Sequence, residues 1–145
     1  MMLPMVNTAE PISPLGGGGR LLIISEGFEA RSLSWISTQK QDDLFAHAII
    51  CKYDPGRKNR FDELYHAVSV RTLSAPKVLS YNRFDPTPFE SEIMREFGEV
   101  LSLVEEIVID VSVMSKMLIM IILHALRSYS DRIRIIYSEP NTWSP

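Results

Sequence analysis

The sequence predicts an α/β domain built on a parallel β-sheet, and three features indicate it. Short runs of branched apolar residues recur along the chain, as in strands that are buried on both faces. Longer segments between these runs repeat apolar residues at helical spacing, and Gly, Pro or Asp residues separate the two kinds of segment. Strands that alternate with helices in this way are joined by right-handed crossovers into a parallel sheet.

Five segments have the character of strands and four that of helices. The strands are predicted at residues 21–24, 46–53, 77–81, 107–109 and 133–137. The helices are predicted at residues 30–40, 61–73, 89–104 and 115–129. The last helix is apolar almost all round, which predicts that it packs deep in the domain. Cys51 lies in the second apolar run and is expected to be a buried strand residue.

The relative strength of the apolar runs predicts the order of the strands. The first and fourth runs are the strongest, and the third is short and polar. We therefore expect a Rossmann-like five-stranded sheet of order 3-2-1-4-5, with helices on both faces. Residues 20–145 are assigned to this domain. Residues 1–19, which contain several prolines and end in a glycine run, are expected to form a flexible leader and linker.

Composition argues against several classes of protein. The net charge of −3 shows no basic excess, so a duplex nucleic-acid binder is not expected. The apolar run 117–123 is far shorter than the ~20 residues that span a bilayer, so no membrane segment is expected. One cysteine allows no intrachain disulfide and suggests a reducing, cytoplasmic setting. The histidines lack metal-ligand spacing, and we predict no metal and no cofactor.

Ligands of such sheets bind beyond the carboxyl ends of the strands, so the loops there are the candidate site. The loop after the first strand contains Glu26, Gly27, Phe28, Glu29 and Arg31. One interpretation is a strand-to-helix turn in which Glu29 favours the amino end of the helix. The other is a ligand loop in which Glu29 and Arg31 face the crevice.

Two further segments add polar groups to the same edge. The loop after the second strand has the densest positive charge in the chain, and Arg57, Asn59 and Arg60 could bind an anion there. The alternative is a solvated loop. After the fifth strand, Glu139 could accept a hydrogen bond from a ribose or a base.

The fourth strand is followed by the most distinctive segment. Asp110 ends the strand, and Ser112 and Ser115 come before Lys116 and an apolar helix. The hydroxyls can cap the helix, and the same helix end can bind an anion. Lysine in a first helical turn is unfavourable for the helix dipole, which favours a ligand role.

The stretch 110–116 (Asp-Val-Ser-Val-Met-Ser-Lys) resembles a turn of CRISPR-associated Rossmann-fold (CARF-like) sensor domains and related prokaryotic defence modules. Those domains have an Asp-x-Thr-Gly-Gly-Thr-Lys turn after the fourth strand and a ligand loop after the first. Asp110, Ser112, Ser115 and Lys116 match that turn in kind and spacing, whereas valine and methionine replace its paired glycines. The resemblance implies binding of cyclic or linear oligonucleotide signals, frequent dimerisation and control of an attached effector.

The main functional hypothesis is a sensor domain for a small anionic nucleotide-type ligand in an antiviral defence system. The two serines and Lys116 would hold an anion, the arginines would neutralise it, and Glu29 and Asp110 would read hydroxyl groups. A second hypothesis is an enzyme that cleaves a nucleotide or NAD, with Glu29 or Glu139 as the acid/base residue. A third is a non-catalytic interaction module that docks an effector protein or a second copy.

Overall fold

The sheet is six-stranded and parallel throughout, with the order β1-β6-β5-β2-β3-β4. It is seen in a computed structural model that describes residues 5–6, 19–27, 32–40, 44–54 and 61–139. The strands are β1 (Met5–Val6), β2 (Arg20–Ser25), β3 (His47–Asp54), β4 (Lys77–Asn82), β5 (Glu106–Asp110) and β6 (Ile133–Ile136). Strands β2 to β6 have the predicted order 3-2-1-4-5, so the Rossmann-like α/β fold is confirmed.

Strand β2 lies at the centre of the sheet and is buried on both faces. Leu21 and Ile23 belong to one apolar cluster, and Leu22 and Ile24 belong to the other. This division follows from the strand geometry, because successive side chains point to opposite faces. The two clusters form the hydrophobic core on either side of the sheet.

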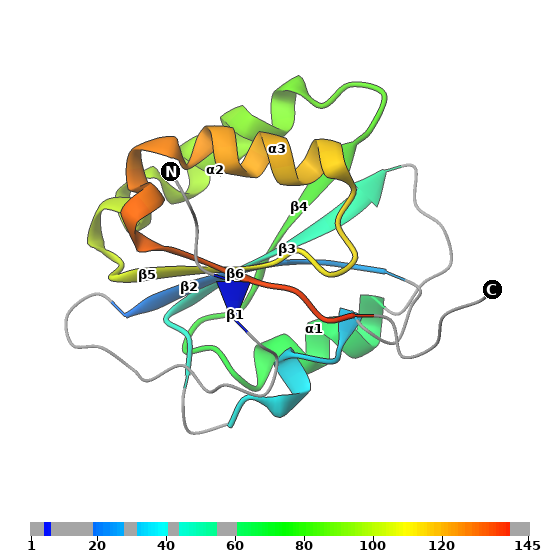
Figure 1. Cartoon of the computed structure of the whole chain (residues 1–145), viewed down its shortest axis with the longest axis vertical. Coiled ribbons are helices and arrows are strands. Elements are labelled where there is room, and N and C mark those ends of the chain that lie inside the picture. Colours follow the sequence, from blue (N-terminus) through cyan, green and yellow to red (C-terminus); the bar gives the residue numbers. More distant parts are fainter. Residues whose placement is uncertain (1–4, 7–18, 28–31, 41–43, 55–60, 140–145) are drawn as a thin grey trace.

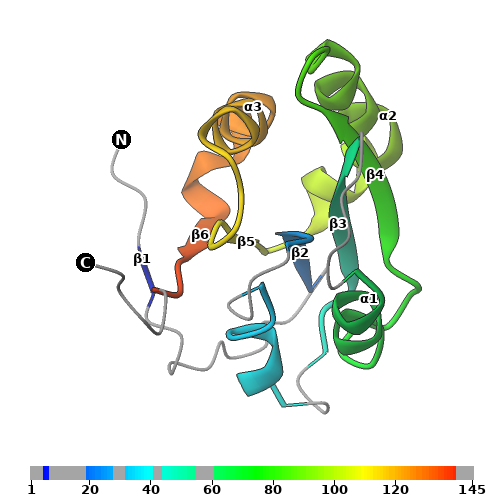
Figure 2. The same ribbon diagram turned by 90° about the vertical axis from the view of Figure 1, so that its right-hand side faces the viewer.

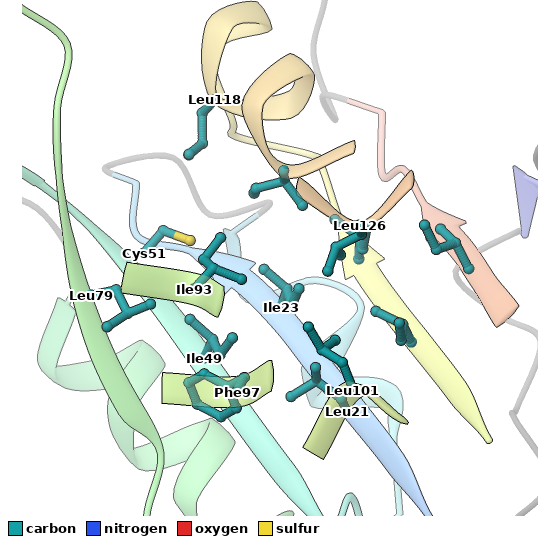
Figure 3. Packing of buried hydrophobic residues seen from close by; sticks show 14 of the residues in the cluster. Leu21, Ile23, Ile49, Cys51, Leu79, Ile93, Phe97, Leu101, Leu118 and Leu126 are labelled. Carbon is teal, nitrogen blue, oxygen red and sulfur yellow. The ribbon is translucent and has the colours of Figure 1, made fainter. Parts of the chain in front are cut away.

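Helices cover both faces. Helices α2 (Thr87–Leu103) and α3 (Lys116–Ala125) lie on one face, and α1 (Phe61–Ser69) and the 3₁₀ helix η2 (Ile36–Thr38) lie on the other (Figures 1 and 2). Helix α2 buries the apolar side that its periodicity predicts. Ile93, Phe97 and Leu101 point from it onto the sheet (Figure 3).

Cys51 is the buried strand residue that the sequence predicts. Its side chain has no exposed surface and packs in the cluster beneath α2 and α3 (Figure 3). Burial raises the pKa of its thiol, because the thiolate would lose its hydration. Cys51 is therefore an apolar packing residue.

The helix predicted at 30–40 is wrong for the part of it that the structure describes. Residues 32–40 contain the three-residue 3₁₀ helix η2 and no α-helix. The Thr38 hydroxyl donates to the Trp35 carbonyl at 2.6 Å, and the Gln39 N–H donates to the Ile36 carbonyl at 3.1 Å. Hydroxyl side chains that bond the local backbone in this way compete with an α-helix.

Two other helices are shorter than predicted. Helix α1 ends at Ser69, because the chain beyond it pairs with Phe45: the Phe45 N–H donates to the Arg71 carbonyl, and the Leu73 N–H donates to the Phe45 carbonyl. Helix α3 ends at Ala125 and is followed by the 3₁₀ helix η3 (Arg127–Arg132).

Helix α3 is also less deeply packed than its apolar sequence predicts. Leu118 and Ile122 are fully buried, but Met117 is 52% exposed and Met120 is 65% exposed. The helix therefore covers the sheet with one side only. Its outer side carries exposed methionines where polar residues are usual. An apolar sequence pattern alone does not distinguish such a helix from one that is buried on all sides.

Strand β1 lies within the range assigned to the leader. Met5 and Val6 pair in parallel with Ile135 and Ile136 of β6. Residues 1–4 and 7–18 lie outside the described residues, so the assignment of the rest of this range stays a prediction.

The central position of β2 predicts that Leu22→Ala is strongly destabilising. Leu22 is fully buried, and its truncation should lower the free energy of unfolding by about 2–5 kcal/mol through lost burial and a cavity. The matched control is Leu103→Ala, whose side chain is 70% exposed. It should change stability by about 0.5 kcal/mol or less in urea denaturation. Equal losses in both variants would contradict the buried position of Leu22.

Candidate functional site at the carboxyl edge of the sheet

Buried polar side chains gather where the central strands end. The carboxyl ends of all the strands lie at one edge of the sheet, as the parallel pairing requires. Most of the buried polar residues in the described part of the chain end or follow β2, β5 and β6 at this edge: Ser25, Glu26, Asp110, Ser112 and Ser138. The edge therefore differs from the rest of the interior, which is almost wholly apolar.

Glu26 directly follows β2 and has no exposed surface. Its N–H donates to the Cys51 carbonyl at 3.0 Å, so the backbone continues the pairing with β3. Its Oε1 accepts a hydrogen bond from the Tyr53 N–H at 2.9 Å. Its Oε2 is also buried but has no hydrogen-bond partner. One carboxylate oxygen is thus fixed by a hydrogen bond within the fold, and the other has no hydrogen-bond partner.

Asp110 and Ser112 shape the turn after β5. Asp110 Oδ1 accepts from the Ser112 N–H at 3.1 Å and from the Ser112 hydroxyl at 2.5 Å. The same hydroxyl accepts from the Ser138 N–H at 2.8 Å. Ser112 therefore joins the β5 turn to the chain that leaves β6. This hydroxyl, predicted to hold an anion, is engaged inside the protein.

Ser115 is the N-cap of α3. Its side chain accepts from the Leu118 N–H at 3.2 Å, which satisfies one free donor of the helix end. Its own N–H donates to the Tyr53 hydroxyl at 3.0 Å. Lys116 is the first residue of the helix and is exposed. The capping interpretation of Ser115 is thus confirmed, and a ligand role for Lys116 stays a prediction.

Tyr53 connects the two halves of the site. Its N–H binds Glu26, and its hydroxyl lies 3.4 Å from the Val113 carbonyl, to which it donates, and binds the Ser115 N–H. Its ring packs edge-on against Tyr81 at 5.7 Å, and burial raises the pKa of Tyr81. Neither tyrosine was predicted from the sequence as a site residue. Their position at the ends of neighbouring strands was the available signal.

The loop after β2 touches the turn after β5. A Cβ atom placed on Gly27 would lie 2.9 Å from Val113 Cγ2, so only a glycine fits without a shift. The two segments that the sequence analysis expects to share one surface are therefore in contact at this point.

Several predicted site residues lie outside the described residues: Phe28, Glu29, Arg31, Arg57, Asn59 and Arg60. Their proposed roles stay predictions. Glu139 is described and is exposed, directly after the buried Ser138. Glu26, Gly27, Asp110, Ser112, Ser115 and Lys116 all lie at the carboxyl edge of β2 and β5, as predicted.

The contact between Gly27 and Val113 predicts a steric effect. Gly27→Ala should lower the free energy of unfolding by about 1–3 kcal/mol, because the β-branched Val113 cannot easily move away. The control is Gly98→Ala in α2, where no heavy atom lies within 4 Å of the new Cβ and a gain of about 0.5–1 kcal/mol is expected. Adding Val113→Ala should reduce the cost of Gly27→Ala in urea denaturation. Strictly additive effects of the two changes would contradict the contact.

The Ser112 hydroxyl predicts a second effect on stability. Ser112→Ala should cost about 1–3 kcal/mol, because it leaves the buried Ser138 N–H without its acceptor. The control is Ser102→Ala, since that exposed hydroxyl donates to the Glu99 carbonyl of its own helix. It should cost about 0.5 kcal/mol or less. Similar midpoints of urea denaturation for both variants would show that the Ser112 link is not needed.

No helix within the described ranges is long and apolar enough to cross a membrane. Among the same residues, no group of three or more His, Cys, Asp and Glu side chains could share a metal ion. Comparisons of the chain with protein-family models, with curated proteins and with solved structures give no match. Function is therefore inferred from the residues and geometry of this chain.

Proposed function

We propose that this protein binds a small nucleotide-type ligand over the carboxyl ends of β2 and β5. Parallel sheets of this order bind ligands beyond the carboxyl ends of their strands, where the strand order reverses. Here the reversal falls between β2 and β5, because the chain builds outward from β2 through β3 and β4 and then returns to β5. The contact of Gly27 with Val113 lies at this same position.

The observation that carries the proposal is the state of Glu26. A buried carboxylate is costly unless hydrogen bonds satisfy it, and Oε2 of Glu26 has none. A ligand with donor groups would supply the missing bond. Helix α3 begins at the same edge, and the positive end of its dipole suits the phosphate of such a ligand.

The biological setting of the proposal comes from the resemblance of the 110–116 turn. The proposed protein is a sensor domain of a prokaryotic defence system that changes the activity of an effector when its ligand binds. A second copy of the chain is a further proposed partner. The strand-to-helix placement of this turn and the Ser115 cap support that reading. The enzyme hypothesis has less support, because Glu139 is exposed and Glu29 lies outside the described residues.

A binding panel tests the proposal. AMP, GMP, CMP, UMP, NAD and cyclic di- and tetra-adenylate are each titrated by calorimetry, and thermal shift is recorded in parallel. At least one should bind and raise the melting temperature, because a ligand that binds only the folded state stabilises it. Glu26→Gln should weaken that binding, whereas Glu99→Gln on the exposed surface of α2 should not. If no compound binds at millimolar concentration, the proposal fails.

A further inference from the structure

We infer that Glu26 selects a neutral hydrogen-bond donor of the ligand, a sugar hydroxyl or a base amino group, and excludes phosphate from its side of the site. This inference rests on the proposed function and names the chemical group that the buried carboxylate recognises. It differs from the expectation of an anion pocket, because the polar side chains that the structure shows buried here include two carboxylates.

The first support is that Glu26 is held in one orientation. Its backbone N–H is bound to the Cys51 carbonyl at 3.0 Å, and its Oε1 is bound to the Tyr53 N–H at 2.9 Å. Both partners belong to β3, so the carboxylate is fixed against a neighbouring strand. A group held in this way needs no reordering when a ligand arrives, which favours binding.

The second support is the chemistry of the open oxygen. Oε2 is an acceptor, is buried, and has no hydrogen-bond partner. Buried polar atoms in folded proteins are nearly always satisfied, so the missing partner of Oε2 needs an explanation, and a bound ligand supplies one. The missing partner must donate a hydrogen bond, and ribose hydroxyls and base amino groups are the donors of a nucleotide.

The third support is charge. The Glu26 carboxylate has no exposed surface. It repels an anion, and the repulsion is strong where water is excluded. A phosphate therefore has to lie away from Glu26, and a hydroxyl or amino group can approach it.

The experiment compares each compound of the binding panel with two kinds of analogue. One kind lacks a sugar hydroxyl, at the 2′ or 3′ position. The other has a base amino group replaced by oxygen, as in IMP for AMP and UMP for CMP. For a compound that binds, we expect one analogue to bind roughly 10- to 100-fold more weakly, the range expected for a hydrogen bond to a charged group.

The variant Glu26→Gln identifies the carboxylate as the cause. Glutamine can still accept from the Tyr53 N–H, but its amide places a donor where Oε2 now accepts. The variant should bind the parent compound and its discriminated analogue with nearly equal affinity. A purely structural role for Glu26 would weaken both equally and preserve the ratio. Glu99→Gln should keep both the affinity and the ratio.

The outcomes separate this inference from the proposed function. Binding that discriminates a hydroxyl or an amino group, with the discrimination lost in Glu26→Gln, supports both and shows which donor is read. Binding of a compound with no loss for any analogue overturns the inference and leaves the proposed function standing. Absence of binding by every compound overturns both. If Glu26→Gln does not fold, the analogue series on the unaltered protein still overturns the inference when no analogue loses affinity.

Discussion

The burial of β2 on both faces is the constraint on which the rest of the structure depends. A strand with no exposed side chain needs a neighbour on each edge and a layer on each face. Strands β3 and β5 are the neighbours of β2 in the sheet. One apolar cluster, beneath α2 and α3, covers one face, and the other cluster, beneath α1 and η2, covers the opposite face. Because every strand is parallel to β2, all of the strand ends meet at one edge. The polar residues that follow β2 and β5 are therefore neighbours, although more than 80 residues separate them in the chain.

The same constraint explains why the polar groups at that edge bind one another. Several polar groups are buried where the central strands leave the sheet. Ser112 satisfies the Ser138 N–H, and Tyr53 satisfies the Ser115 N–H and an oxygen of Glu26. Unpaired groups in such surroundings cost free energy. Oε2 of Glu26 is one of the buried polar atoms at this edge that have no hydrogen-bond partner, as is Oγ of Ser138.

The sequence predicts five of the six strands well because each of these five contains a local apolar run, whereas β1 was assigned to the leader. The apolar runs at 21–24 and 107–109 are too continuous for a half-exposed strand, and their central position followed from that alone. The helix at 30–40 was mispredicted for the described residues, where the Thr38 hydroxyl bonds to the nearby Trp35 carbonyl and competes with an α-helix. The link through Tyr53 was not foreseen, since it joins residues 27 and 62 positions apart and depends on strand register. Exposed methionines on α3 were missed because a hydrophobic pattern does not distinguish a buried side chain from a bare one.

The contact between Gly27 and Val113 distinguishes the 110–116 turn from the sensor-domain turn that its sequence resembles. Paired glycines in such a turn let the backbone approach a phosphate closely. In this protein the turn carries Val113 and Met114, and the glycine lies across from them at position 27. The space that a glycine turn would leave open is thus filled by the valine side chain, which packs against the loop after β2. The backbone at Val113 is therefore less accessible to a phosphate than the backbone of a glycine turn would be. Under the proposed function, the ligand chemistry that suits these residues is hydrogen-bond donation to Glu26, with the charged part of the ligand directed elsewhere along the edge.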